Sequence, residues 1–269
     1  MPKIPFSFYF LTVLFIFIGG IYVFRFGGSS NYLITNILYL IPPFLAVISG
    51  VSATVSYSLE SPRGKTLLFL TLGLLSFFIG EAIWFYLRII LNIDPYPSVA
   101  DIFFLSGYPL LLFALLNELK LHRLNLKAMS KFTKALLAVL VVLLSLIVFY
   151  FGVFLAYMPA ASFLENFFAL SYGIGDLILI IPALLVLKTT LDYGQGRLFG
   201  PWMFIFHGFV FTLVGDLLFA IYYNQYKNLV WPYTLIDLAW IISYLCFTYG
   251  FFGIIAALSA VQRKMKLSA

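Results

Sequence analysis

Long apolar runs, separated by short polar connections, are the dominant pattern of this sequence. A helix needs roughly 20 mainly apolar residues to cross the hydrocarbon core of a membrane. Because the runs have about this length, the pattern predicts an all-α membrane protein with eight transmembrane helices. The runs are Ile4–Phe24, Ile34–Tyr57, Leu67–Ile93, Asp101–Leu116, Ala135–Met158, Phe163–Leu187, Gly200–Tyr223 and Val230–Ala260. The fourth is the shortest, so we expect Asp101 at or just inside the membrane boundary.

Composition agrees with this pattern. Hydrophobic residues make up 63% of the 269 residues and charged residues only 10%, whereas soluble domains are about 25% charged. The sequence therefore leaves no room for a sizeable soluble domain, and we expect one integral membrane unit.

Basic residues are distributed unevenly between the two sets of connections. With the N-terminus inside the cell, thirteen of the 16 lysines and arginines fall in cytoplasmic segments and two, Arg25 and Lys227, in outer connections. Cytoplasmic loops of membrane proteins carry such an excess. The prediction is a cell-membrane protein with both termini cytoplasmic. The net charge of +6 then reflects topology and contact with membrane lipids, and no nucleic-acid partner is expected.

The chain also contains an internal repeat. The stretch 73–81 in the third run matches 208–216 in the seventh, and each ends in glycine followed by an acid, Glu81 or Asp216. A Pro-Tyr pair then precedes Asp101 in one copy and Asp237 in the other, and each aspartate is followed by an aromatic residue at i+3 and a tyrosine at i+7. The pattern predicts two parallel four-helix repeats, residues 1–130 and 131–269, related by an axis along the membrane normal.

Ionisable groups inside the apolar runs mark the candidate site, because a charge in lipid is costly and usually faces the protein interior. Several share a helix face with aromatic residues at i+3 or i+7. We therefore predict a polar, aromatic-walled cavity in the outer half of the bilayer. Its candidate ligand-binding residues are Glu81, Trp84, Arg88, Asp101, Tyr108, Tyr172, Asp176, Asp216, Asp237, Trp240 and Tyr244. An alternative is that the same buried pairs only hold the helices together.

Metal or cofactor binding is not expected. The sequence contains two histidines and one cysteine, Cys246, which gives no zinc-type ligand spacing. It also lacks the sequence motifs of soluble hydrolases and nucleotide-binding proteins, so no catalytic residue is assigned.

The stretch from Pro95 to Pro109, PYPSVADIFFLSGYP, resembles multipass sensor segments that precede histidine kinase or diguanylate cyclase modules in bacteria and archaea. The resemblance implies a membrane input domain that detects a small molecule, a lipid or a membrane state. No kinase or cyclase sequence follows the eighth run, so the resemblance implies signalling through a separate partner.

Two other functions remain open. Parallel repeats with an acid, Asp176, near the membrane midplane also suit a proton- or ion-coupled transporter. The Gly-acid dipeptides in adjacent runs resemble those of lysoplasmalogenase-type membrane enzymes, which implies an intramembrane lipid hydrolase in which buried acids activate water.

Overall fold

The computed structural model describes residues 6–24, 30–122, 129–159, 161–192 and 198–268, and the regular elements within these ranges are helices. In chain order they are α1 (Phe6–Phe24), α2 (Asn31–Tyr39), α3 (Ile41–Tyr57), α4 (Pro62–Phe85), α5 (Val99–Leu121), α6 (Lys131–Ile147), α7 (Phe163–Asp192), α8 (Phe199–Lys227) and α9 (Tyr233–Ser268). A π-helical segment extends α4 (Tyr86–Ile90) and another extends α6 (Val148–Phe154). Within the described ranges, seven helices are long and apolar enough to cross a membrane, and Tyr9–Phe24 is a shorter apolar helix. The chain therefore has the helices of a multi-pass membrane protein.

The second predicted run consists of two helices that together form one span. Helix α2 ends at Tyr39 and α3 begins at Ile41 with Pro42 and Pro43 in its first turn. Proline lacks the backbone N–H that would continue the ladder and disfavours the helical conformation of the residue before it. The two prolines thus explain the break at Leu40.

Helix α5 is longer at both ends than the predicted run. It starts at Val99 and ends at Leu121, so that Glu118 is buried within it. One oxygen of Glu118 lies 2.9 Å from an Arg63 nitrogen and 3.1 Å from His122 Nε2. The prediction of an unusually short fourth helix was wrong because the basic partners of Glu118 could not be identified from hydropathy.

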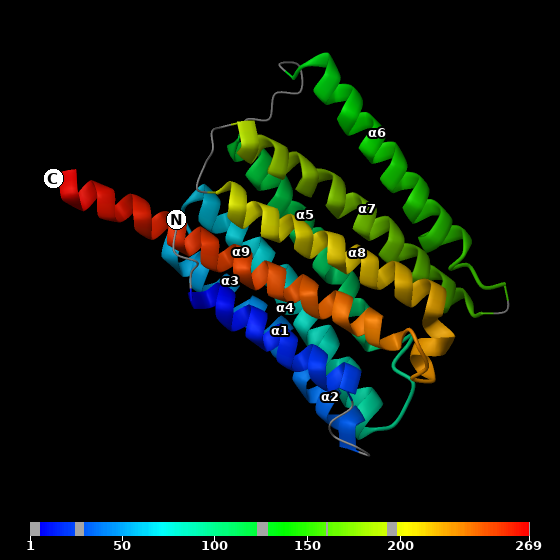
Figure 1. The fold of residues 1–269 in the computed structure, drawn as a ribbon. Helices are drawn as coiled ribbons and strands as arrows, with labels where there is room; N and C mark the ends of the chain where they lie inside the picture. The colour runs from blue at the N-terminus through cyan, green and yellow to red at the C-terminus, as the bar shows by residue number, and fades with distance from the viewer. Residues whose placement is uncertain (1–5, 25–29, 123–128, 160, 193–197, 269) are drawn as a thin grey trace.

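Six helices form a closed ring in which each packs against the next, in the order α3, α4, α5, α7, α8, α9 and back to α3. Each half of the chain supplies three consecutive helices of the ring, and the halves meet where α5 packs on α7 and α9 on α3. Helix α1 packs on α9 outside the ring. Helix α6 lies at the edge of the bundle in Figure 1, and none of its residues is buried. The ring encloses the main core, and α1 and α6 are peripheral.

The start of α1 and the end of α9 lie at the same end of the bundle, together with the turn between α3 and α4 (Figure 1). Basic residues near this end include Arg63, Lys65 and Lys131. Other basic residues used for the topology prediction, among them Lys3, Arg123 and Arg197, lie outside the described residues. The assignment of this end to the cytoplasm stays a prediction from charge.

The helix pairs α4–α5 and α8–α9 pack through matching contacts. A side chain at Gly80 would collide with the ring of Phe104, and one at Gly215 with the ring of Trp240. Each glycine thus lets an aromatic ring from the neighbouring helix lie against the backbone. Hydroxyl pairs at 2.8 Å join the same helices: Ser76 with Ser106, and Thr212 with Ser243.

Candidate functional site

A cavity lies inside the helix ring, towards the end of the bundle opposite to the start of α1. Its walls come from α2, α4, α5, α7, α8 and α9 and from the segment that follows α6. The cavity has a volume of about 100 Å³ that is open to the centre of a water molecule. A single water needs about 10–15 Å³ of such volume. The space can therefore hold several waters or a small organic group.

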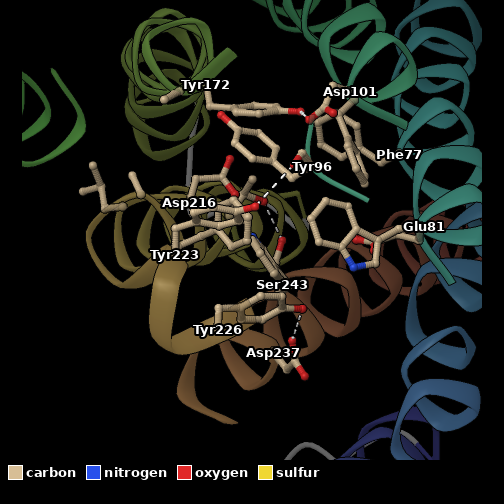
Figure 2. A pocket seen from close by; sticks show the side chains of 18 of the residues that line it. Phe77, Glu81, Tyr96, Asp101, Tyr172, Asp216, Tyr223, Tyr226, Asp237 and Ser243 are labelled. Atoms are coloured by element: carbon tan, nitrogen blue, oxygen red, sulfur yellow. Dashed lines mark hydrogen bonds between the residues drawn. The ribbon is translucent and has the colours of Figure 1, made fainter. Parts of the chain in front are cut away.

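Four carboxyl groups on four different helices line this cavity. They belong to Glu81 on α4, Asp101 on α5, Asp216 on α8 and Asp237 on α9. Figure 2 shows them around one space together with tyrosine side chains. The predicted convergence of these four acids is therefore present in the structure. Among the described residues that line the cavity there is no lysine, arginine or histidine.

Asp101 has a structural reason for its position. Its Oδ2 accepts a hydrogen bond from the Ser98 backbone N–H at 2.6 Å, and the Ser98 side chain caps the first turn of α5 in return. This capping box satisfies orphan N–H groups at the helix start. The other oxygen, Oδ1, accepts from the Tyr172 hydroxyl at 2.6 Å. Both oxygens of Asp101 are therefore used within the protein.

Tyr108 joins two aspartates. Its hydroxyl lies 3.0 Å from Asp176 Oδ1 and 3.1 Å from Asp216 Oδ2. A phenol carries one hydrogen, so it cannot donate fully to two carboxylates at once. The geometry requires either an additional proton on one carboxyl or a hydrogen shared between both. The second oxygen of Asp216 accepts from Trp240 Nε1 at 2.7 Å.

Glu81 receives two tyrosines on one oxygen. Its Oε1 accepts from the Tyr39 hydroxyl at 3.0 Å and from the Tyr244 hydroxyl at 2.9 Å. The contacts of Glu81 and Asp216 are reciprocal, because each acid accepts from a tyrosine of the other half of the chain. The carboxyl–tyrosine pairs thus connect the two halves at the level of the cavity.

An aromatic cluster forms the wall beside Asp237. The Tyr226 hydroxyl donates to Asp237 Oδ1 at 2.8 Å. The rings of Trp84, Phe219, Tyr226 and Trp240 all line the cavity. They meet at tilted or edge-to-face angles with centroid distances from 5.1 to 6.4 Å, the arrangement favoured by aromatic quadrupoles.

Two predicted site residues do not line the cavity. Arg88 lies in the π-helical segment that extends α4 and is not among the residues that line the cavity. Its guanidinium instead sits 5.0 Å from the Tyr226 ring centroid and donates to the Tyr226 carbonyl at 3.1 Å. Asp176 lies behind the lining residue Tyr108, and its Oδ2 is buried with no hydrogen-bond partner among the described residues.

Residues of the loop between α4 and α5 contribute to the far end of the cavity. Tyr96 is buried, and its hydroxyl donates to the Glu165 backbone carbonyl at 2.8 Å. Burial raises the pKa of this phenol, so it remains a donor. The Tyr223 hydroxyl donates to Asp94 at 3.0 Å, and Lys227 pairs with the same carboxylate at 2.5 Å. These contacts tie the loop to α7 and α8.

Sequence reasoning missed several lining residues. Tyr39 donates a hydrogen bond to Glu81, and Tyr226 donates one to Asp237. Each tyrosine lies on a different helix from its acid. Phe219 follows Asp216 at i+3 and carried a signal, because it matches Trp84 in the repeat. No comparable signal marked the two tyrosines.

The described residues contain no group of three or more histidine, cysteine, aspartate or glutamate side chains placed to hold an ion. What the cavity offers chemically is a set of carboxyl oxygens, phenol hydroxyls and aromatic rings.

No family model matches the chain, and no curated protein and no solved structure is significantly similar to it. The fold and the site therefore define the class directly: a multi-pass helical membrane protein with an acidic, aromatic-walled cavity between its two halves.

Proposed function

We propose that this chain is a membrane sensing or ligand-binding module whose cavity holds a small molecule or part of a lipid, and whose occupancy is read by a separate partner protein. The single observation that carries the proposal is the convergence of four carboxyl groups from four helices on one internal space. Such groups are costly in a membrane and usually mark a functional position. The resemblance of the Pro95–Pro109 stretch to sensor segments supports the same class.

The proposal includes a tandem repeat of two four-helix units. The matching glycine–aromatic and hydroxyl contacts of α4–α5 and α8–α9 favour a duplication of a four-helix unit. The cavity then lies between the repeats, where a rotation of one half against the other would change its shape. A change of this kind is a physical route from ligand binding to a signal.

Mass spectrometry of compounds extracted from mildly purified protein tests the proposal. Wild type is compared with a Glu81→Gln/Asp216→Asn double variant, which removes two carboxyl charges from the wall while keeping side-chain size. We expect a specific compound with wild type and its loss from the variant. Thermal unfolding of both proteins controls for folding. Identical bulk lipid in both samples, with both folded, would mean that the acids only hold the helices together.

A proton-coupled transporter is the second candidate, and a specific observation favours it. Tyr108 places one phenol hydrogen between the buried carboxyls of Asp176 and Asp216, so this group can exist with or without an additional proton. Ligand flux into liposomes under a proton gradient, abolished by Asp176→Asn, would support transport. Binding without flux would count against it.

A further inference from the structure

We infer that the cavity binds an organic cation, with an ammonium group held by Glu81 and the surrounding aromatic rings. The inference rests on the proposed function and names the chemical class of its ligand. Among the described residues it combines a carboxylate oxygen that accepts no hydrogen bond, aromatic rings in the same cavity, and a lining without a basic side chain.

The hydrogen bonds of the acids single out Glu81. Asp101 uses one oxygen for the cap of α5 and the other for Tyr172, and Asp216 uses its two oxygens for Trp240 and Tyr108. Asp237 is hydrogen-bonded to two tyrosines, Tyr226 and Tyr22. Glu81 receives both of its tyrosines on Oε1. Within the described residues its Oε2 accepts no hydrogen bond, although the side chain lines the cavity and only 9% of the residue is exposed.

Because Glu81 is buried, the lack of a hydrogen bond to its Oε2 among the described residues has an energetic cost. A buried carboxylate is strongly unfavourable unless a charge or hydrogen bond compensates it. The basic residue closest in sequence, Arg88, is directed to Tyr32 and to the Tyr226 carbonyl instead. A cation that enters the cavity would supply the missing compensation.

The aromatic wall suits the same ligand. Ring faces attract cations through their quadrupole, most strongly for tryptophan, and two tryptophans, Trp84 and Trp240, line the space. Tyr226 already stabilises one cation, since the Arg88 guanidinium lies 5.0 Å from its ring centroid. The available volume limits the group to a small one, such as a methylated ammonium.

Titration of purified protein with choline and with its neutral isostere, 3,3-dimethyl-1-butanol, tests the inference, because the two molecules differ in charge and hardly in shape. Methylammonium and tetramethylammonium extend the series. Calorimetry measures binding in nanodiscs of phosphatidylglycerol, which offers no ammonium headgroup. We expect saturable binding of at least one cation and none of the neutral alcohol.

Two matched variants locate the site. Glu81→Gln keeps the acceptor for both tyrosines but removes the charge, and we expect at least a tenfold loss of cation affinity. Glu60→Gln makes the same change at an exposed position at the opposite end of the bundle, and we expect no change. Trp84→Phe keeps a ring with a weaker quadrupole and should reduce affinity less than Glu81→Gln does. Unfolding temperatures of all three confirm that they fold.

Nanodiscs of phosphatidylcholine distinguish two sources of the ammonium group. Suppressed choline binding there identifies a lipid headgroup as the natural ligand, and unchanged binding identifies a free solute. The inference is overturned if no cation of the series binds, if the alcohol binds as tightly as choline, or if Glu81→Gln leaves affinity unchanged. A specific neutral or anionic compound extracted from wild type would overturn only the ligand class and leave the proposed function standing.

Discussion

At the residue scale, the hydroxyl of Tyr108 is a hydrogen-bonding group that two carboxyl groups share. It serves Asp176 and Asp216 together, and Asp176 is almost fully buried. A buried acceptor that loses its donor costs about 1–3 kcal/mol. The side chain therefore stabilises both aspartates inside the helix ring.

Tyr108→Phe should lower the free energy of unfolding by about 2 kcal/mol, because it leaves the two carboxyl groups without their shared donor. Equilibrium unfolding in detergent micelles measures the change. Tyr86→Phe removes the same hydroxyl from an exposed tyrosine and should change stability by less than about 0.5 kcal/mol. Equal effects of the two substitutions would show that the shared hydrogen bond contributes nothing.

Glu118 makes a second test at this scale. It is fully buried and accepts hydrogen bonds from Arg63 and His122 on a single oxygen. Removal of one partner of a buried pair costs about 3–5 kcal/mol; because Arg63 is one-quarter exposed, we expect about 2 kcal/mol for Glu118→Ala. Chemical unfolding measures this, with Glu60→Ala as the exposed control. A loss no larger than that of the control would contradict the buried pairing.

Nine of the eleven predicted site residues line one cavity; that they bind a ligand stays a prediction. Charges and their helical neighbours could be identified because lipid exposure makes them costly. Arg88 is not part of the lining, because it contacts Tyr32 and the Tyr226 carbonyl, and neither partner could be inferred from hydropathy. The tyrosines Tyr39 and Tyr226 were missed because their roles depend on the order of helices around the ring, which comes from packing across the chain.

At the element scale, glycines set the closeness of the helix pairs. Gly215 faces Trp240, whose indole nitrogen donates to Asp216. The two glycines and the rings that cover them belong to the repeat that the sequence predicts. The helix break at Leu40 was not predicted, although Pro42 and Pro43 explain it, and the π-helical extensions of α4 and α6 have no comparable sequence signal.

Gly215→Ala should destabilise the protein by about 1–3 kcal/mol, because the added methyl group collides with Trp240 and displaces it from Asp216. The shift is read from unfolding curves, and the tryptophan fluorescence should change with it. Gly20→Ala is the matched control: no atom lies within 4 Å of its added Cβ, so the substitution should be neutral or slightly stabilising. Unaltered stability and fluorescence in Gly215→Ala would refute close packing of α8 on α9.

At the scale of the whole molecule, the described helices alternate in direction so that the turns collect at two ends (Figure 1). The hydropathy pattern predicts this alternation, and the orientation in the membrane stays a prediction from the charge bias. The ring order could not be predicted, since α5 packs on α7 and α9 on α3, across the two halves.

Cysteine labelling of cells tests the orientation. In a Cys246→Ser background, a membrane-impermeant maleimide should label Lys227→Cys in intact cells, and Glu60→Cys only after permeabilisation. Both positions are exposed and lie at opposite ends of the bundle. The reverse pattern would place the termini outside the cell.

The central claim is that the internal space is a binding site, and a change of volume alone tests it most directly. Ala220 lines the cavity, and Ala138 lies on the exposed surface of α6. Native mass spectrometry measures the amount of compound bound per protein in Ala220→Phe and Ala138→Phe. The account predicts that the surface variant retains the compound of wild type and that the cavity variant loses it. Equal retention in both folded variants would contradict a ligand site in this cavity.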